Sequence, residues 1–190
     1  TDVPDSDKFL PLLQEFRSLG IETAASIESL STQLDACVVL IASRTAGMPS
    51  LFNSALGRGA RLILLEKPGA PTVAELEKMR LNAQDAGATV FMGFNKNLAE
   101  YVDVAREATK GPSLGDSHLV YVHDNDYKLD DLAEVFQRNA EGMAKNMLIH
   151  ELALAVTYHG ITSDDCTLRF DPPFVPEEFF THAATAGGLT

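Results

Sequence analysis

The chain has 190 residues, of which 45% are hydrophobic and 22% charged, and its formal net charge is −12. This length fits one large domain or parts of two, and the composition is ordinary for a globular protein. The acidic balance argues against nucleic-acid binding, which takes clustered Lys and Arg, and no apolar stretch is long enough to span a bilayer. We therefore expect neither nucleic acid nor a membrane as a partner.

The cysteines and histidines give no sign of a metal site. Cys37 and Cys166 lack metal-ligand spacing, and the five histidines are scattered along the chain. Two such thiols favour a reducing compartment and buried, inert side chains, so we expect a cytoplasmic protein without a metal. Because the sequence begins at Thr1 and not at Met, we expect a processed, trimmed or partial chain.

The first half of the chain alternates between helical and strand patterns. A helix is expected from Asp7 to Leu19, where apolar residues at three-and-four spacing predict one buried face: Phe9, Leu10, Leu13 and Phe16. Apolar runs predict strands over residues 35–43, 60–65 and 88–95, and helices are expected over residues 49–56 and 72–86. Thr72 and Glu75 form a capping-box pattern. This alternation predicts an α/β fold with a doubly wound parallel sheet whose strands are buried on both faces.

The pattern becomes less regular after residue 110. Helices are expected over residues 98–109 and 144–159, and strands over residues 118–123 and 166–170. The expected buried faces of the two helices contain Tyr101, Val102, Ala105 and Ala108 in the first, and Met147, Leu148, Leu152, Leu154 and Val156 in the second. A turn at residues 111–115 separates the halves, which predicts a second, α+β unit.

Charged and polar residues follow the predicted strands directly. The apolar run Leu62–Leu65 ends in Glu66, Lys67 and Pro68, and Pro68 stops the strand because it has no N–H. Glu66 and Lys67 are thus expected at the carboxyl end of a strand, where open α/β sheets bind their ligands. Ser43-Arg44-Thr45 follows the preceding strand in the same way. The alternative interpretation is a salt-bridged strand end without a function.

Three segments together resemble a known family. Glu66-Lys67-Pro68 closes one strand, Gly93-Phe94-Asn95 closes the next, and His150 follows on a helix. In this order the segments resemble the glucose–fructose oxidoreductase and inositol dehydrogenase family (Gfo/Idh/MocA). The resemblance implies a partial Rossmann-like, dinucleotide-binding domain at residues 1–110. It also implies part of a C-terminal open-sheet domain for substrate binding or oligomerisation at residues 111–190.

The resemblance also implies an activity. Family members transfer a hydride between NAD or NADP and a polyol, sugar or related hydroxy compound, and they form dimers or tetramers. The family's lysine near the nicotinamide ribose and substrate hydroxyl corresponds to Lys67, and its acid–base histidine to His150. The other cofactor-binding candidates are the strand-end residues Ser43, Arg44, Thr45, Glu66 and Asn95.

Two departures from the family pattern qualify this prediction. The family has an aspartate four residues before its histidine, whereas this chain has Asn146, which can contact a substrate hydroxyl but carries no charge. Glu151 is a poor substitute because adjacent helical residues point about 100° apart. In addition, no Gly-x-Gly-x-x-Gly turn occurs in the sequence. We therefore expect a family member truncated at both ends.

Three alternatives remain open at this point. In the first alternative, which Asn146 and the missing glycine turn favour, the chain is a non-catalytic family member used for ligand sensing or assembly. In the second alternative, Lys67 forms a Schiff base with a carbonyl substrate, which usually requires a desolvated lysine. In the third, His150 is a hydrogen-bonded structural histidine on a packed helix.

Overall fold

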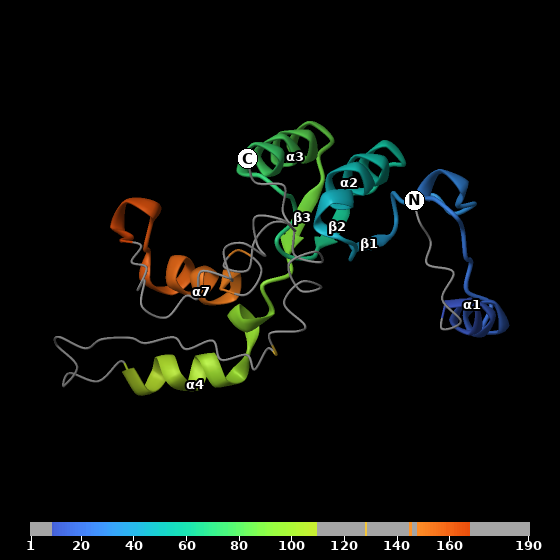
Figure 1. Ribbon diagram of the computed structural model, residues 1–190. Helices are drawn as coiled ribbons and strands as arrows, with labels where there is room; N and C mark the ends of the chain where they lie inside the picture. Colours follow the sequence, from blue (N-terminus) through green and yellow to red (C-terminus); the bar gives the residue numbers. More distant parts are fainter. Residues whose placement is uncertain (1–8, 110–127, 129–144, 146–147, 168–190) are drawn as a thin grey trace.

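A three-stranded parallel sheet forms the centre of the computed structural model, which describes residues 9–109, 128, 145 and 148–167 (Figure 1). The strands are β1 (Val38–Ile41), β2 (Leu62–Leu65) and β3 (Thr89–Met92), and they lie side by side in chain order. Val38 pairs with Leu62, and Leu62 pairs with Thr89. The predicted α/β fold with a parallel sheet is confirmed for this part of the chain.

Both crossover helices cover the same face of the sheet. α2 (Met48–Gly57) and α3 (Val73–Asp85) lie on one side of the strands in Figure 1. Between the helices and the sheet are the most deeply buried large side chains of the described residues, Phe52 and Ile63, at 1% and 0% exposure. α3 begins with the predicted capping box, in which the Thr72 hydroxyl accepts a hydrogen bond from the Glu75 N–H at 3.2 Å.

The opposite face of the sheet is open among the described residues. Val38 is 69% exposed, Leu40 60% and Phe91 58%, while their neighbours on the strands point into the core. The predicted burial on both faces is therefore wrong here. The reason is topological: each successive strand is added on the same side of the preceding one, and right-handed crossovers then place both helices on one face.

The N-terminal helix, α1 (Phe9–Ser18), lies apart from the sheet in Figure 1. The helix itself was predicted, but the expected burial is met only in part, because Phe9, Leu13 and Phe16 are partly buried and Leu10 is 58% exposed. Apolar spacing predicts a helix with one apolar face, but it does not supply the surface that this face packs against. A short 3₁₀ helix, η1 (Ile27–Ser29), precedes β1.

Beyond β3 the chain forms a second group of helices. These are η3 (Asn95–Leu98), α4 (Glu100–Thr109), α7 (Ile149–His159) and η5 (Ser163–Asp165), and α7 packs on η3. None of the helices described in the structure is long and apolar enough to cross a membrane. The predicted domain at residues 111–190 falls mostly outside the described residues, so the boundary near residue 110 stays a prediction.

The predicted burial of these helices is only partly correct. Val102 of α4 and Leu154 of α7 are buried as expected. The other predicted inward residues that the structure describes are exposed: Tyr101, Ala105, Ala108, Leu148, Leu152 and Val156. Met147 lies outside the described residues. The expected burial of the two thiols is also wrong, because Cys166 is exposed and Cys37 only partly buried. Cys166 and Thr167 form no strand, and residues 168–170 lie outside the described part.

Candidate active site

The carboxyl ends of the three strands meet at one edge of the sheet. The Glu66 N–H donates to the Ile41 carbonyl at 2.9 Å, and the Gly93 N–H donates to the Leu65 carbonyl at 2.8 Å. The ladder thus continues one residue past β2 and β3. As a result, the segments that follow the strands, at residues 42–45, 66–68 and 93–95, leave the sheet side by side, which is where ligands bind in open α/β sheets.

Lys67 lies in a turn that is fixed by packing. The Lys67–Pro68 peptide bond is cis, and Pro68 and Gly69 are buried. Gly69 has a φ of +82°, and a Cβ there would lie 2.8 Å from the Met92 methyl group and 2.9 Å from a Leu76 methyl group. Only glycine satisfies both the conformation and the space. The backbone that carries Lys67 is therefore closely packed against the core.

Lys145 adds a contact to this turn from the other half of the chain. Its ammonium group donates to the Ala70 carbonyl at 2.9 Å and also to the Pro71 carbonyl. Carbonyl groups outside regular structure need such partners when they are taken from water. A distant segment thus stabilises the loop that begins at Lys67.

Glu66 lies across the ends of β2 and β3. Its carboxylate accepts a hydrogen bond from the Lys67 N–H at 3.2 Å. A Cβ on Gly93 would lie 3.2 Å from the Glu66 Oε1 atom, closer than ordinary van der Waals contact. The glycine at the end of β3 therefore leaves the space that this carboxylate occupies.

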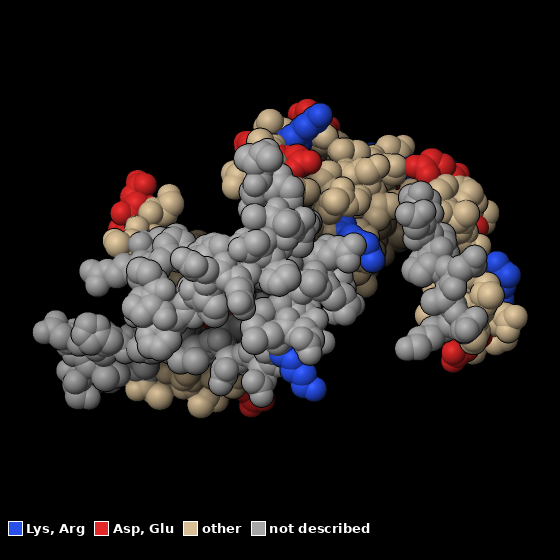
Figure 2. Space-filling view, viewed as in Figure 1, with Lys and Arg blue, Asp and Glu red and all other residues tan. Residues whose placement is uncertain are grey.

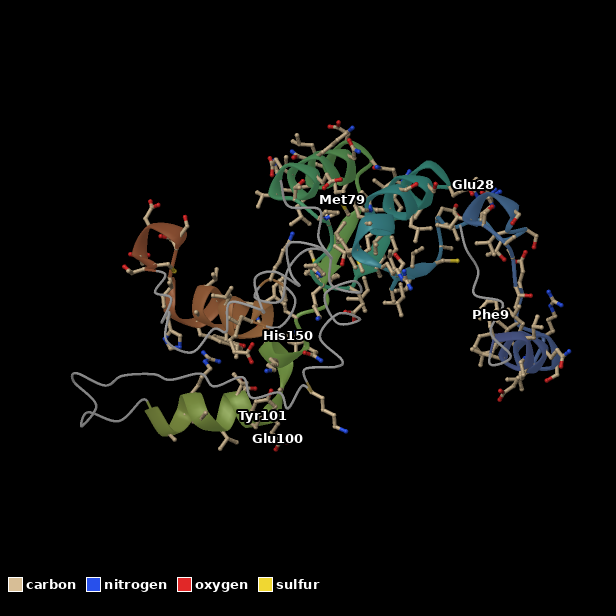
Figure 3. All side chains as sticks on the ribbon, viewed as in Figure 1. Phe9, Glu28, Met79, Glu100, Tyr101 and His150 are labelled. Carbon is tan, nitrogen blue, oxygen red and sulfur yellow. The ribbon has the colours of Figure 1, made fainter. Side chains whose placement is uncertain are left out.

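His150 reaches the same edge from the first turn of α7. Its ring meets the Phe94 ring edge to face, with centroids 6.4 Å apart and an interplanar angle of 87°. Figure 3 shows His150 at the end of α7 that is nearest to β3 and η3. Its Nδ1 atom is buried and makes no hydrogen bond to any described residue. Among the described residues, no hydrogen bond at this atom supports the interpretation of His150 as a hydrogen-bonded structural histidine.

The surroundings of His150 favour its neutral form. Burial is the main cause that lowers the pKa of its imidazole, and the positive charges of Lys67 and Lys96 lower it further. The carboxylates of Glu151 and Glu66 act in the opposite direction but do not reverse the shift. A neutral imidazole can accept a proton, which is the requirement for a general base.

The other predicted site residues are distributed along the same edge. Ser43 and Arg44 are exposed after β1, and the Ser43 hydroxyl donates to the Arg44 carbonyl at 3.2 Å. Thr45 begins the 3₁₀ helix η2 (Thr45–Gly47), and Asn95 is exposed at the start of η3. Asn146 lies outside the described residues. The structure thus brings Glu66, Lys67 and His150 together, while the assigned roles of all these residues stay predictions.

An ion pair beside His150 was not predicted from the sequence. The Lys96 ammonium group binds the Glu151 carboxylate, and Glu151 is the one charged residue that is buried in the described part of the chain. The prediction that Glu151 is a poor substitute for the family aspartate stays a prediction, and the Glu151 charge does act on the imidazole of His150. What the sequence did not reveal is that η3 lies beside Glu151 and supplies the cation.

Two apolar grooves occur among the described residues. A groove of about 270 Å³ lies between Phe94 and α7, beside His150, and is lined also by Ile149, Leu152 and Val156. A larger one, about 750 Å³, lies under α2 and α3 and is lined mainly by Phe52, Leu76, Met79, Val90 and Met92. The larger groove is on the helix-covered face of the sheet, and neither Lys67 nor His150 lines it. Figure 2 shows one face of the molecule, on which the described Lys and Arg side chains lie singly.

Comparison with known proteins supports the architecture. Residues 6–94 match the Gfo/Idh/MocA oxidoreductase family with the NAD-binding Rossmann fold. The structure of myo-inositol 2-dehydrogenase from Lactobacillus plantarum is similar with a TM-score of 0.56 and 17% identity, covering 76% of this chain and 44% of that one. The apo scyllo-inositol dehydrogenase from Lactobacillus casei gives 0.55 and 18%, covering 77% and 43%.

The sequence identity and the length covered limit what these similarities show. At such identities the two solved structures show a shared fold alone, and the chain spans less than half of the length of either. No curated protein matches the chain.

Proposed function

We propose that the protein transfers a hydride between NAD or NADP and a hydroxy compound, because residues 6–94 match the oxidoreductase family with the NAD-binding Rossmann fold. The observation that supports a catalytic role is the meeting of Lys67 and His150. They come from segments far apart in the chain, yet the charge of Lys67 is the second largest cause of the lowered pKa of His150.

His150 is proposed as the general base in the direction of alcohol oxidation. Its neutral imidazole takes the proton from the substrate hydroxyl while the adjacent carbon loses a hydride. In the reverse direction the imidazolium returns the proton to the carbonyl oxygen. A positioned acid–base group of this kind contributes roughly 10²- to 10⁴-fold to the rate.

Lys67 is proposed to stabilise the substrate oxygen. During hydride loss, negative charge develops on this oxygen, and a fixed cation beside it lowers the free energy of the transition state. The same cation disfavours the imidazolium form of His150, so it also maintains the base in its reactive state. The packed turn around Gly69 holds the Lys67 backbone in place.

We propose that the described strand-end residues hold the nicotinamide end of the cofactor. Two polar groups lie near the ends of the strands: the buried Nδ1 atom of His150, and the Glu66 carboxylate, which lies against Gly93. Ser43, Arg44, Thr45, Glu66, Lys67 and Asn95 are the residues proposed to hold the cofactor. When bound, the nicotinamide ring accepts or donates the hydride. The residues for the pyrophosphate are not among those described, since no glycine-rich turn joins a described strand to a helix.

The proposed substrate is a polyol or sugar-like compound. Two structures with the same fold are inositol dehydrogenases by name, and an inositol has the secondary hydroxyl that this chemistry requires. Asn146 is proposed to bind a neighbouring hydroxyl. By resemblance to the family, we further propose a cytoplasmic homodimer or homotetramer whose second domain comprises residues 111–190.

The test is a titration of NADH and NADPH against the protein, followed by oxidation assays with inositols and sugars. Lys67→Met and His150→Asn are expected to lower kcat by at least about 10²-fold each. The matched control is Lys78→Met, which removes an exposed lysine on α3 and should leave kcat unchanged. The assay should include both this chain and the longest product of its gene.

A non-catalytic family member is the second candidate, and the neutral Asn146 with the missing glycine turn favours it. Absence of cofactor binding in every form of the protein would decide for this alternative. Borohydride trapping of a substrate on Lys67 would instead indicate Schiff-base chemistry.

A further inference from the structure

Three side-chain contacts join α7 to η3. Lys96 forms the ion pair with Glu151, the Asn97 amide donates to the Thr157 hydroxyl at 2.8 Å, and the Tyr158 hydroxyl donates to the Asn97 carbonyl at 2.6 Å. The first contact lies in the first turn of α7, beside His150, and the other two lie near the opposite end of the helix. The orientation of α7 on η3 is therefore fixed at both ends.

Of these three contacts, the Lys96–Glu151 pair is the one that removes charged groups from water. The Glu151 side chain is 10% exposed and that of Lys96 30%. A carboxylate so removed from water is stable only with a cation beside it, and loss of one partner leaves an uncompensated charge. A cation beside Glu151 is thus required, and Lys96 on η3 supplies it.

We propose that the Lys96–Glu151 ion pair is a positioning element for His150, which fixes the first turn of α7 and balances two opposite charges beside the imidazole. Its relevance to catalysis rests on the function proposed above, whereas its effect on His150 does not. Lys96 and Glu151 are positioning residues, because they act on His150 and are not assigned a contact with substrate.

The charges around His150 predict the direction in which each substitution shifts the pKa of its imidazole. Lys67 and Glu66 face the imidazole from the turn after β2, Lys96 from η3, and Glu151 from α7. Removal of the Lys96 charge must raise the pKa of His150, and removal of the Glu151 charge must lower it. Removal of both charges together should shift the pKa less than removal of the Lys96 charge alone, since the two contributions oppose each other.

The experiment is an NMR pH titration of the His150 imidazole in this chain, with the resonance assigned from the spectrum of His150→Asn. Lys96→Gln is expected to move the midpoint upward and Glu151→Gln downward. The double variant should titrate between the two single variants, and Lys96→Arg should titrate close to the unaltered chain. Thr157→Val is the matched control, because it removes a contact between α7 and η3 that carries no charge.

Two outcomes would overturn the proposal. One is a pair of single variants whose midpoints do not move, or move in the same direction. The other is a Thr157→Val midpoint displaced as far as that of Lys96→Gln, which would mean that loosening α7 alone accounts for the effect. If a single variant does not fold, the double variant and Lys96→Arg decide, since a Lys96→Arg midpoint far from that of the unaltered chain, or a double-variant midpoint displaced further than that of the single variant that does fold, would contradict charge balance.

This readout is separate from the proposed activity. The titration needs neither cofactor nor substrate, so it can succeed even when the oxidoreductase assay fails. Where activity is present, the pH midpoint of kcat/KM should move in the same directions as the NMR midpoint, whereas a merely structural pair would lower activity without moving it.

Discussion

Replacement of Gly69 by alanine should destabilise the protein through two separable effects. The first is conformational, because an L-residue in the left-handed region costs roughly 1–2 kcal/mol, and Gly69 has a φ of +82°. The second is steric, because the new Cβ would lie 2.8 Å from the Met92 methyl group and 2.9 Å from a Leu76 methyl group. Overpacking costs about 1–3 kcal/mol, nearer the lower value where the contacting atoms are side-chain ends that can move.

The two ranges sum to a loss of about 2–5 kcal/mol in the free energy of unfolding, a large part of the stability of an ordinary domain. Gly87→Ala provides the matched control: its φ is +63°, and nothing lies within 4 Å of the added Cβ. It should therefore cost the conformational term alone. Urea unfolding at unchanged m-value measures both variants. Equal midpoints for the two variants would refute the claim that Gly69 is required by packing.

Three further predictions concern the core, a helix cap and the histidine. Ile63→Ala should lower the free energy of unfolding by about 2–5 kcal/mol, whereas Leu64→Ala on the open face should cost far less, as urea denaturation of the pair will show. Thr72→Ala should cost about 1 kcal/mol and Thr72→Ser much less, and a similar loss in both would exclude capping as the cause. Because the pKa of His150 is lowered on folding, the unfolded chain binds more protons in acid. The full stability is thus present above pH 6.5, the ordinary His value, and is lost as pH falls through the lowered pKa. Thermal unfolding from pH 8 to pH 5 should show this loss in the unaltered chain and a smaller one in His150→Gln, and parallel curves would contradict it.

Local patterns predicted the elements of the first half well. The runs ending at Ile41, Leu65 and Met92 form parallel strands, and the helix after Thr72 begins with the predicted cap. These features depend on neighbouring residues, such as a proline that stops a strand or a hydroxyl that accepts from an N–H three residues on. The location of Glu66 and Lys67 at the sheet edge followed from the same local information.

Burial was harder to predict because it depends on what packs against an element. Leu40 and Phe91 belong to apolar runs that look buried on both faces, yet they are exposed because both crossover helices lie on the other side. The apolar face of α1 was equally clear in the sequence, yet Phe9, Leu13 and Phe16 are only partly buried. Sequence periodicity reports the chemistry of a face, whereas topology decides whether that face is covered.

The environment of His150 could be predicted only in part. Resemblance placed it near Lys67, and the structure is consistent with this, but the opposing charges of Lys96 and Glu151 depend on how α7 sits on η3. A contact between residues so far apart in the chain leaves no pattern in a single sequence. The only local signal was the presence of a charged residue directly after His150 on an otherwise apolar helix.

The two central residues of the candidate site therefore have different supports. Lys67 is held by the Gly69 turn, which is packed against β3 and α3, and His150 is held by α7 on η3. The described contacts connect these supports at the end of β3, where Gly93 touches Glu66 and Phe94 touches His150. Perturbations of distant, unshared contacts usually add, so changes at Gly69 and Glu151 should be nearly independent. A side chain added at position 93, by contrast, would displace Glu66, and position 93 directly precedes Phe94, which touches His150. The short segment 93–94 is therefore the place where the geometry of the proposed base, His150, and of the cation, Lys67, can be altered together.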